Sequence, residues 1–373
     1  MNIDNKIYLI TSNAEAGTIE TLPLADSIEI ISNEHLIKTD VCFDANQKVC
    51  ITSETSIEII ANRIDANRAN AIQVLKDKFA FREILSKIYN NYQYRIVKST
   101  DIQHLSVSEK MIIKPIKGCF GTAVRIIEPS TDFKKLSLDL NNELLKNGSI
   151  FSESVLSKND FIVEQYIEGE EYAVDMFYNS KGEPCIVNIY YHPMPNNKAY
   201  LHMIYISSKE VFGEIYDKAK TFFVKLNKIL NVTNFAMHSE FKMNEQDLMP
   251  IEINSMRFGG MGLGNLVYHS LNINPYMYYL NDNEPDWQEI WQENGDNIYT
   301  FFIAYNGENK SVFEFKPNRE KLKQQFTQIL LEHIFDYQKQ LAFAIYCLRE
   351  TNENITKLLK IEFDDYFESN KTA

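Results

Sequence analysis

The chain has 373 residues, which is too long for one ordinary hydrophobic core, so we expect two or three domains. Hydrophobic residues make up 45% and charged residues 24%, as in a folded soluble protein, and the net charge of −13 argues against a nucleic-acid-binding surface. Five scattered cysteines without a CxxC pair favour a reducing compartment and no zinc site. No apolar run approaches the roughly 20 residues that span a bilayer, and the start "MNIDNKIYLITSN" predicts a strand, not a signal peptide. We therefore expect a cytoplasmic protein without membrane or nucleic-acid partners.

Residues 1–100 alternate short β-branched runs with helical patterns. Strands are predicted at "IYLIT", "IEIIS" and "KVCIT", and a helix at "DANRANAIQVLKD" with Asp65 as its cap. A second helix is predicted from "DKFAFREILSKIYNNY", where apolar residues recur at helical spacing and Asp77 is placed to cap the start. This alternation predicts a small open α/β domain. Since GxGxxG is absent, nothing supports a dinucleotide site there.

A glycine-containing loop follows the next predicted strand. In "IIKPIKGCFGTAV", Lys114 ends an apolar run, and Lys117, Gly118 and Gly121 come directly after it. A glycine loop lets backbone N–H groups approach phosphate oxygens while a lysine neutralises their charge. A plain β-hairpin with the two glycines in its turn explains the stretch equally well, because the spacing does not match GxxxxGK[ST].

The stretch "VEQYIEGEEYAVD" ends a second strand, after a predicted helix at "FKKLSLDLNNELLKN". Its strand finishes in polar residues, and the chain turns at Gly169 into another strand. Free backbone groups at such a crossover can bind a planar base, and Glu171 can hold ribose hydroxyls. The alternative is a hairpin with a charged tip.

Two later strands, "FAMHSEFKM" and "LMPIEINSM", each alternate polar and apolar residues. If they pair as a hairpin around "NEQD", Glu240 lies opposite Glu252, with Cβ atoms about 5 Å apart. Two such carboxylates repel each other unless a cation lies between them. Asn254 adds a third oxygen donor on the same face, and hard oxygen ligands suit Mg²⁺. The alternative is a solvated polar face on a half-buried hairpin.

Between and beyond these motifs the pattern is mixed. From residue 172 we expect antiparallel strands "YAVDMFYN" and "EPCIVNIYY", then a long helix at "EIYDKAKTFFVKLNKIL". After about residue 290 we expect two strands, a helix, a strand and a helix. This tail either covers the site or makes a dimer contact.

Taken together and in this order, the motifs resemble those of the ATP-grasp superfamily over about residues 75–275. The likeness is stronger to the L-amino acid ligase and carboxylase-like branch of the carboxylate–amine ligases. It implies an α/β (α+β) ATP-grasp fold with four parts: an N-terminal open α/β domain (1–100), a small lid subdomain (101–175), a large subdomain with the metal site (176–290) and a C-terminal α+β extension (291–373).

The resemblance also implies the site. ATP would be bound by Lys78, Lys114, Lys117, Gly118, Gly121, Thr122, Glu164, Gln165, Tyr166, Ile167 and Glu171. Mg²⁺, or Mn²⁺ in its place, would be bound by Glu240, Glu252 and Asn254. Catalytic roles would fall to Lys114, Arg257 and Gly260, with Arg257 on the substrate carboxylate; a structural Arg257 paired with Asp175 is the alternative. The segment "IYYHPMPNNKAYLHMIY" corresponds to one that often borders the acceptor site in this family, and a tyrosine-rich sheet edge is the plainer explanation.

The function implied is an ATP-dependent carboxylate–amine ligase that forms an acyl phosphate and releases ADP and phosphate. Its substrates would be a small carboxylate and an amine, such as amino acids, and a homodimer is one expected state. The alternatives are a carboxylate–thiol ligase or a phosphotransferase on the same fold, or a non-catalytic ATP-binding regulatory protein.

Overall fold

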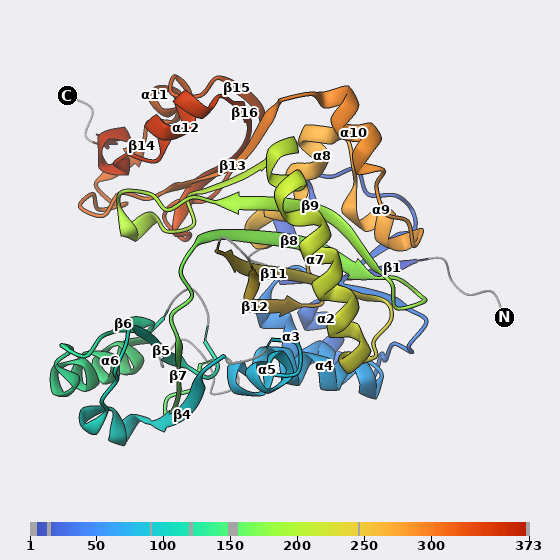
Figure 1. The fold of residues 1–373 in the computed structure, drawn as a ribbon. Coiled ribbons are helices and arrows are strands. Elements are labelled where there is room, and N and C mark those ends of the chain that lie inside the picture. The colour runs from blue at the N-terminus through green and yellow to red at the C-terminus, as the bar shows by residue number, and fades with distance from the viewer. Residues whose placement is uncertain are drawn as a thin grey trace.

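The structure is a computed structural model that describes residues 6–12, 16–89, 92–118, 122–147, 156–244 and 247–370. Within these ranges the strands form sheets of three, four, eight and two strands. Figure 1 shows the four-stranded sheet standing apart from the body that contains the large sheet. Helices and strands alternate along the chain, which confirms the predicted α/β class.

The N-terminal region forms a parallel sheet in the order β2-β1-β3. Its elements are β1 (Ile7–Thr11), α1 (Ala16–Ile19), β2 (Ile28–Ser32), α2 (Asn33–Lys38), β3 (Lys48–Ile51), α3 (Ile57–Ala61), α4 (Ala66–Lys76) and α5 (Lys78–Leu85). Asp65 and Asp77 cap α4 and α5, each accepting hydrogen bonds from two backbone N–H groups, as predicted. The predicted strands and both helices are therefore confirmed, but the second helix ends at Leu85, earlier than the predicted stretch to Tyr92.

The small antiparallel sheet has the order β4-β7-β5-β6, with one long helix against it. Its elements are β4 (Tyr94–Lys98), β5 (Met111–Pro115), β6 (Arg125–Ile127), α6 (Phe133–Asn147) and β7 (Asp160–Gln165). Buried leucines of α6, Leu136, Leu140 and Leu144, pack against the sheet and form a core of their own. Because β4 begins at Tyr94, the sheet takes in residues that the sequence analysis placed in the N-terminal domain.

The large sheet is antiparallel, in the order β12-β11-β8-β9-β10-β13-β16-β15. Its strands are β8 (Glu170–Tyr178), β9 (Pro184–His192), β10 (Ile204–Ser208), β11 (Phe235–Met243), β12 (Leu248–Ser255), β13 (Ile298–Tyr305), β15 (Gln328–Ile334) and β16 (Ala342–Glu350). Helix α7 (Lys209–Leu230) crosses one face of this sheet and buries its apolar side there (Figure 1). The tail therefore extends the same sheet that contains the predicted metal pair.

The remaining elements are α8 (Leu266–Leu271), α9 (Pro275–Leu280), α10 (Trp287–Asn294), β14 (Phe315–Pro317), α11 (Arg319–Lys323), α12 (Asn352–Leu358) and β17 (Phe367–Ser369). Between α11 and α12 lie two strands, β15 and β16, so the prediction of one strand there is wrong. The turn between them, residues 335–341, contains no glycine or proline, and no turn signal marked it. No helix in the described ranges is long and apolar enough to cross a membrane.

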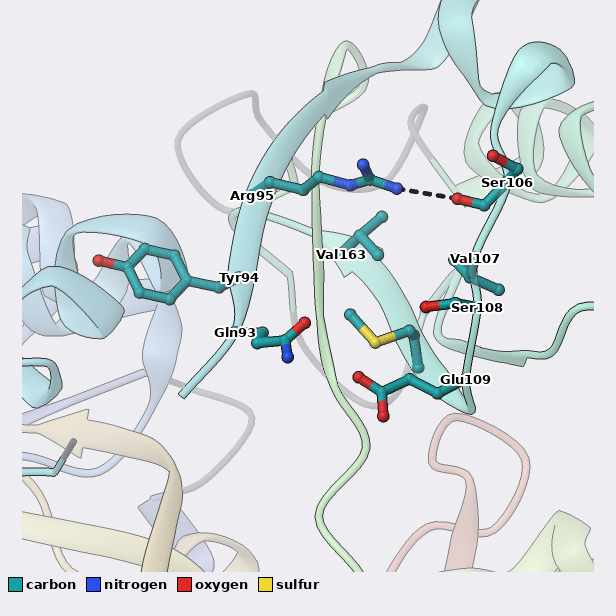
Figure 2. A pocket seen from close by; sticks show the side chains of 9 residues that line it. Gln93, Tyr94, Arg95, Ser106, Val107, Ser108, Glu109 and Val163 are labelled. Atoms are coloured by element: carbon teal, nitrogen blue, oxygen red, sulfur yellow. Dashed lines mark hydrogen bonds between the residues drawn. The ribbon is translucent and has the colours of Figure 1, made fainter. Parts of the chain in front are cut away.

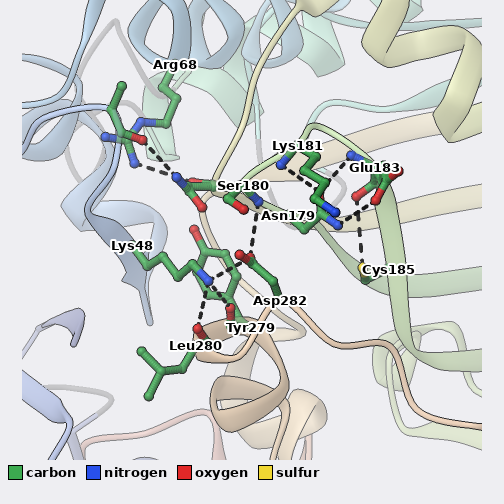
Figure 3. Close-up of polar contacts among 12 residues, drawn as sticks. Lys48, Arg68, Asn179, Ser180, Lys181, Glu183, Cys185, Tyr279, Leu280 and Asp282 are labelled. Atoms are coloured by element: carbon green, nitrogen blue, oxygen red, sulfur yellow. Dashed lines mark hydrogen bonds and ion pairs between the residues drawn. The ribbon is translucent and has the colours of Figure 1, made fainter. Parts of the chain in front are cut away.

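Lys48 connects three parts of the fold (Figure 3). Its ammonium donates to the carbonyl oxygens of Tyr279 (2.7 Å) and Leu280 (2.8 Å) and pairs with Asp282 at 2.7 Å. The Asp282 carboxylate also accepts from the backbone N–H of Ser180, in the turn between β8 and β9. The N-terminal sheet, the end of α9 and the large sheet are thus tied together by one buried cation.

Candidate active site

The predicted carboxylate pair forms as expected. Strands β11 and β12 are antiparallel neighbours, and Glu240 lies directly opposite Glu252. The Asn254 side chain joins them, with its Nδ2 3.5 Å from Glu240 Oε1. A register shift follows Glu240 in the pairing. The hairpin therefore brings the three predicted metal ligands together on one face.

The charges of the pair suit a divalent cation. Burial and the repulsion of Glu252 raise the pKa of Glu240 to about 7. Burial also opposes the ionised form of Glu252, but Lys78 and Lys114 outweigh it and hold the pKa of Glu252 below its ordinary value. The described residues contain no cluster of three or more His, Cys, Asp and Glu that could hold a metal. Two carboxylates and one amide oxygen match Mg²⁺, which keeps waters and shares its ligands with phosphates.

Both predicted phosphate lysines are buried beside this pair. Lys78 begins α5, and its Nζ lies 3.3 Å from Glu252 Oε1 and 3.3 Å from the carbonyl oxygen of Gly118. Lys114 belongs to β5, and its Nζ is 2.5 Å from Glu164 Oε1. Burial lowers the pKa of Lys114, and repulsion from neighbouring cations adds to the effect, although Glu164 opposes it. Each ammonium group is therefore paired with one carboxylate, Lys78 with Glu252 and Lys114 with Glu164.

Glu164, expected at the adenine, instead places its carboxylate in a buried ion-pair cluster. It accepts from Arg82 Nε (2.5 Å) and Nη2 (3.2 Å) as well as from Lys114. Arg82 also donates to the carbonyl oxygens of Pro250 and Ile251 on β12. Sequence reasoning missed Arg82, although its position four residues after Lys78 on α5 gives the two side chains a common face. The backbone of Glu164 lies in β7, between Tyr94 of β4 and Ile112 of β5.

The crossover from β7 to β8 contains the other predicted nucleotide residues. The Tyr166 ring lies under the ammonium groups of Lys110 (4.0 Å) and Lys242 (5.7 Å). The Glu171 carboxylate lies 2.7 Å from His192 Nδ1; burial raises its pKa, but the contact with His192 outweighs this and lowers it. Gly169 has φ +119°, and a Cβ there would lie 2.0 Å from the carbonyl oxygen of Met243, so the turn requires glycine.

The predicted lid loop is described only in part. Lys117, Gly118 and Thr122 belong to the described ranges, whereas Gly121 lies outside them. The backbone carbonyl of Lys117 accepts from the N–H of Ser157 at 3.0 Å, and that of Gly118 accepts from Lys78. Gln165 and Ile167 lie at the end of β7 and just beyond it, where Gln165 N–H donates to the carbonyl of Gln93.

A cavity of about 210 Å³ opens beside the carboxylate pair, and Arg257, Gly260 and His202 of the predicted substrate side line it. Its lining comprises Glu54, His202, Tyr205, His238, Glu240, Glu252, Asn254, Arg257, Gly260, Met261, Leu263, Phe301, Ile303, Tyr305 and Leu341. The phosphate lysines and the crossover residues do not line it. Of these side chains, Glu54 and the tail residues were not predicted, because they come from parts of the chain far from the motifs.

Arg257 is free to bind a ligand in this cavity. The alternative prediction, in which Arg257 pairs with Asp175, is wrong. The Asp175 carboxylate is hydrogen-bonded to His238 Nδ1 and Tyr190 Oη, each at 2.7 Å. Arg257 Nη1 donates to the carbonyl of Phe258 at 3.3 Å, while its Nε is buried without a hydrogen-bond partner among the described residues. A buried donor without a partner is costly, and an anion in the cavity would satisfy it.

The tyrosine- and histidine-rich segment contributes one edge of the cavity. The His192 ring stacks on Tyr205 with centroids 4.3 Å apart and an interplanar angle of 4°. His202 continues the stack at 5.4 Å from His192, and its Nδ1 lies 3.0 Å from Tyr205 Oη. His202 and Tyr205 face the cavity, so this segment is more than a sheet edge.

Residues 107–265 match the sequence profile of the ATP-grasp domain. The chain carries an ATP-grasp domain. The matched range includes β5, β6 and β7 of the small sheet, the crossover, the carboxylate pair and Arg257. The match supports an ATP-dependent ligase that uses ATP and Mg²⁺. A search of curated proteins gives no match.

Solved structures with the same fold cover nearly the whole chain. An L-amino acid ligase from Bacillus licheniformis superposes with a TM-score of 0.68 at 14% identity, covering 99% of this chain and 100% of that one. A biotin carboxylase from Campylobacter jejuni, solved as a β,γ-ATP complex, gives 0.60 at 12%, covering 98% and 86%. A biotin carboxylase domain from Hydrogenobacter thermophilus, in complex with MgADP, ADP and bicarbonate, gives 0.55 at 12%, covering 98% and 85%. The similarity of fold therefore extends beyond the matched domain over nearly the whole chain.

A separate cavity of about 210 Å³ lies in the small sheet (Figure 2). It is bordered by β4 and by the segment before β5, where Arg95 donates to the carbonyl of Ser106 at 3.1 Å. None of the predicted site residues lines this cavity, so we assign the chemistry to the cavity beside the carboxylate pair.

Proposed function

We propose that the protein is an ATP-dependent carboxylate–amine ligase. The observation that supports this best is the combination of two opposed carboxylates with an unsatisfied arginine in one cavity. The carboxylates provide a metal site for nucleotide phosphates, and the arginine provides a counter-charge for an acid. A ligase of this class must bring two anions together, so it needs both.

The chain's own residues suit the two steps of the reaction. First, a substrate carboxylate oxygen bonds to the γ-phosphorus of ATP, the bond to the β,γ-bridging oxygen breaks, and ADP leaves. Lys78 and Lys114 neutralise the phosphates, while Arg257 holds the acid with its planar guanidinium. An amine then attacks the acyl carbon, and inorganic phosphate leaves. Enclosure of the site prevents hydrolysis of the acyl phosphate by water.

Glu240, Glu252 and Asn254 would hold the divalent cation. When bound, the cation reduces the repulsion between phosphates and carboxylate and stabilises charge on the transferred group. Lys78 would keep Glu252 ionised and in place through their contact at 3.3 Å. Asp175 would orient His238, which borders the same cavity.

A coupled ADP-release assay on the full chain tests the proposal. The protein is incubated with Mg²⁺, ATP and pools of amino acids, other amines, thiols or polyols. Mass spectrometry then measures the masses of the products. We expect ADP release that requires both an acid and an amine. The mass of the product should equal the summed masses of the two substrates minus one water. A thioester or a phosphorylated polyol would identify the alternative reactions, and ATP binding without turnover would indicate a regulatory protein.

Glu252→Gln is the matched test of the metal pair. We expect it to fold normally and to lose Mg²⁺-dependent ADP release, because one anionic ligand is gone. Glu289→Gln, an exposed change on α10, serves as the control. Unchanged turnover in Glu252→Gln would contradict the metal assignment.

A further inference from the structure

The cavity has one apolar wall, and the tail of the chain builds most of it. Phe301, Ile303 and Tyr305 come from β13, and Leu341 comes from the turn that precedes β16. Leu263, from the loop after β12, continues the wall. Since the ATP-grasp profile ends at residue 265, the β13 and Leu341 part lies outside the matched domain.

Strand geometry explains why the wall is continuous. Residues 301, 303 and 305 alternate along β13, so their side chains share one face of the sheet. Phe302 and Ala304 point to the other face, into a separate core beneath the last helices. Tyr205 on β10 is paired with Phe301 and extends the same face. The apolar lining is therefore set by the register of the sheet.

The polar part of the lining comes from other strands. Glu240, Glu252 and Asn254 lie on β11 and β12, which β8, β9 and β10 separate from β13 in the sheet, and Arg257 follows β12. A molecule in the cavity therefore meets both charged groups and hydrocarbon. A volume of about 210 Å³ is below the 300–1,000 Å³ typical of drug-sized ligands, so it suits one small molecule and not a peptide.

We propose that this wall selects a carboxylate substrate with an apolar side chain, such as a branched aliphatic or methionine-like amino acid. The inference rests on the proposed function, because it assumes that the carboxyl group of the substrate lies at Arg257. A polar side chain against the wall would lose its hydrogen bonds to water without replacement. One extra or missing methylene in such a pocket changes selectivity roughly 10–200-fold.

Equilibrium binding tests this without requiring turnover. Titration calorimetry on the full chain, with Mg²⁺ and a non-hydrolysable ATP analogue present, compares L-leucine with L-asparagine, which has a similar shape. We expect leucine to bind at least tenfold more tightly. Equal affinities, tighter asparagine binding, or no binding of either amino acid would overturn the proposal.

Two variants locate the selectivity. Leu341→Glu changes a side chain that is 81% exposed at the rim, so the fold should tolerate it. We expect it to weaken leucine binding at least fivefold, whereas Phe313→Glu, a tail residue that is 75% exposed and outside the cavity, should leave it unchanged. Ile303→Thr should reduce the difference in binding affinity between leucine and asparagine. Unchanged selectivity in both wall variants would contradict the proposal.

The same samples separate this proposal from the proposed function. Selective binding of leucine without ADP release would support the proposed role of the apolar wall and refute the proposed ligase activity. ADP release that is equally fast with leucine and with asparagine would support the proposed ligase activity and refute the proposed role of the apolar wall.

Discussion

The ion-pair cluster around Glu164 gives a prediction of stability. Glu164→Gln removes the one carboxylate bonded to both Arg82 and Lys114, and all three side chains are at least 95% buried. In the variant, the buried cations Arg82 and Lys114 would have a neutral amide in place of the carboxylate. Removing one partner of a buried ion pair typically costs about 3–5 kcal/mol.

The pKa of Glu164 gives a similar magnitude. Burial opposes its ionisation, but Arg82 and Lys114 lower its pKa from 4.5 to about 2. That difference corresponds to roughly 3 kcal/mol of stabilisation of the folded state. Because the folded pKa is lowered, this contribution is fully present above pH 4.5 and disappears as the pH falls towards 2. The difference in the free energy of unfolding between wild type and variant should therefore become smaller at acidic pH.

Urea denaturation followed by circular dichroism, at pH 7 and at pH 3.5, measures the effect. Glu168→Gln is the matched control, because Glu168 pairs with Lys110 at an exposed position, and such pairs contribute about 0–1 kcal/mol. A double variant, Glu164→Gln with Arg82→Met, should be more stable than the sum of its single changes, since it removes a stranded cation. A loss at pH 7 no larger than that of Glu168→Gln would refute the reasoning.

Three further predictions follow from the site and the crossover. Lys114→Ala should weaken binding of a non-hydrolysable ATP analogue by about 1.5–3 kcal/mol, and an unchanged dissociation constant in calorimetry would remove this lysine from the phosphate site. Arg257→Lys should lower kcat/KM for the carboxylate substrate about tenfold or more while ATP affinity stays near wild type, because an ammonium cannot bind two oxygens side by side; a lower melting temperature with unchanged kinetics would indicate a structural arginine instead. Gly169→Ala should destabilise the crossover by at least about 1 kcal/mol, since its Cβ would collide with a backbone carbonyl, and a melting curve equal to that of wild type would contradict this.

The local features of this fold were predictable because they depend on neighbouring residues. Strand alternation, together with a hairpin around "NEQD", places Glu240 opposite Glu252. A carboxylate before a helical run identifies the caps at Asp65 and Asp77. The parts that were missed depend on contacts distant in sequence. Arg82 contacts β7 and β12. Glu54 and Leu341 line one cavity although they lie far apart in the sequence. Neither arrangement has a local sequence pattern. The extra tail strand was missed because its turn lacks glycine and proline.

The position of β13 between β10 and β16 has a consequence for the diversification of such enzymes. Most of the side chains proposed to select the substrate lie on β13, which contributes no lysine, carboxylate or arginine to the proposed phosphate site, and Leu341 lies in the turn before β16. Substitutions at Phe301, Ile303 or Leu341 can therefore change the shape of the substrate cavity while the groups that activate ATP keep their places. An enzyme built this way can change the acid that it accepts through substitutions in its tail, outside the strands that carry the proposed ATP and metal residues.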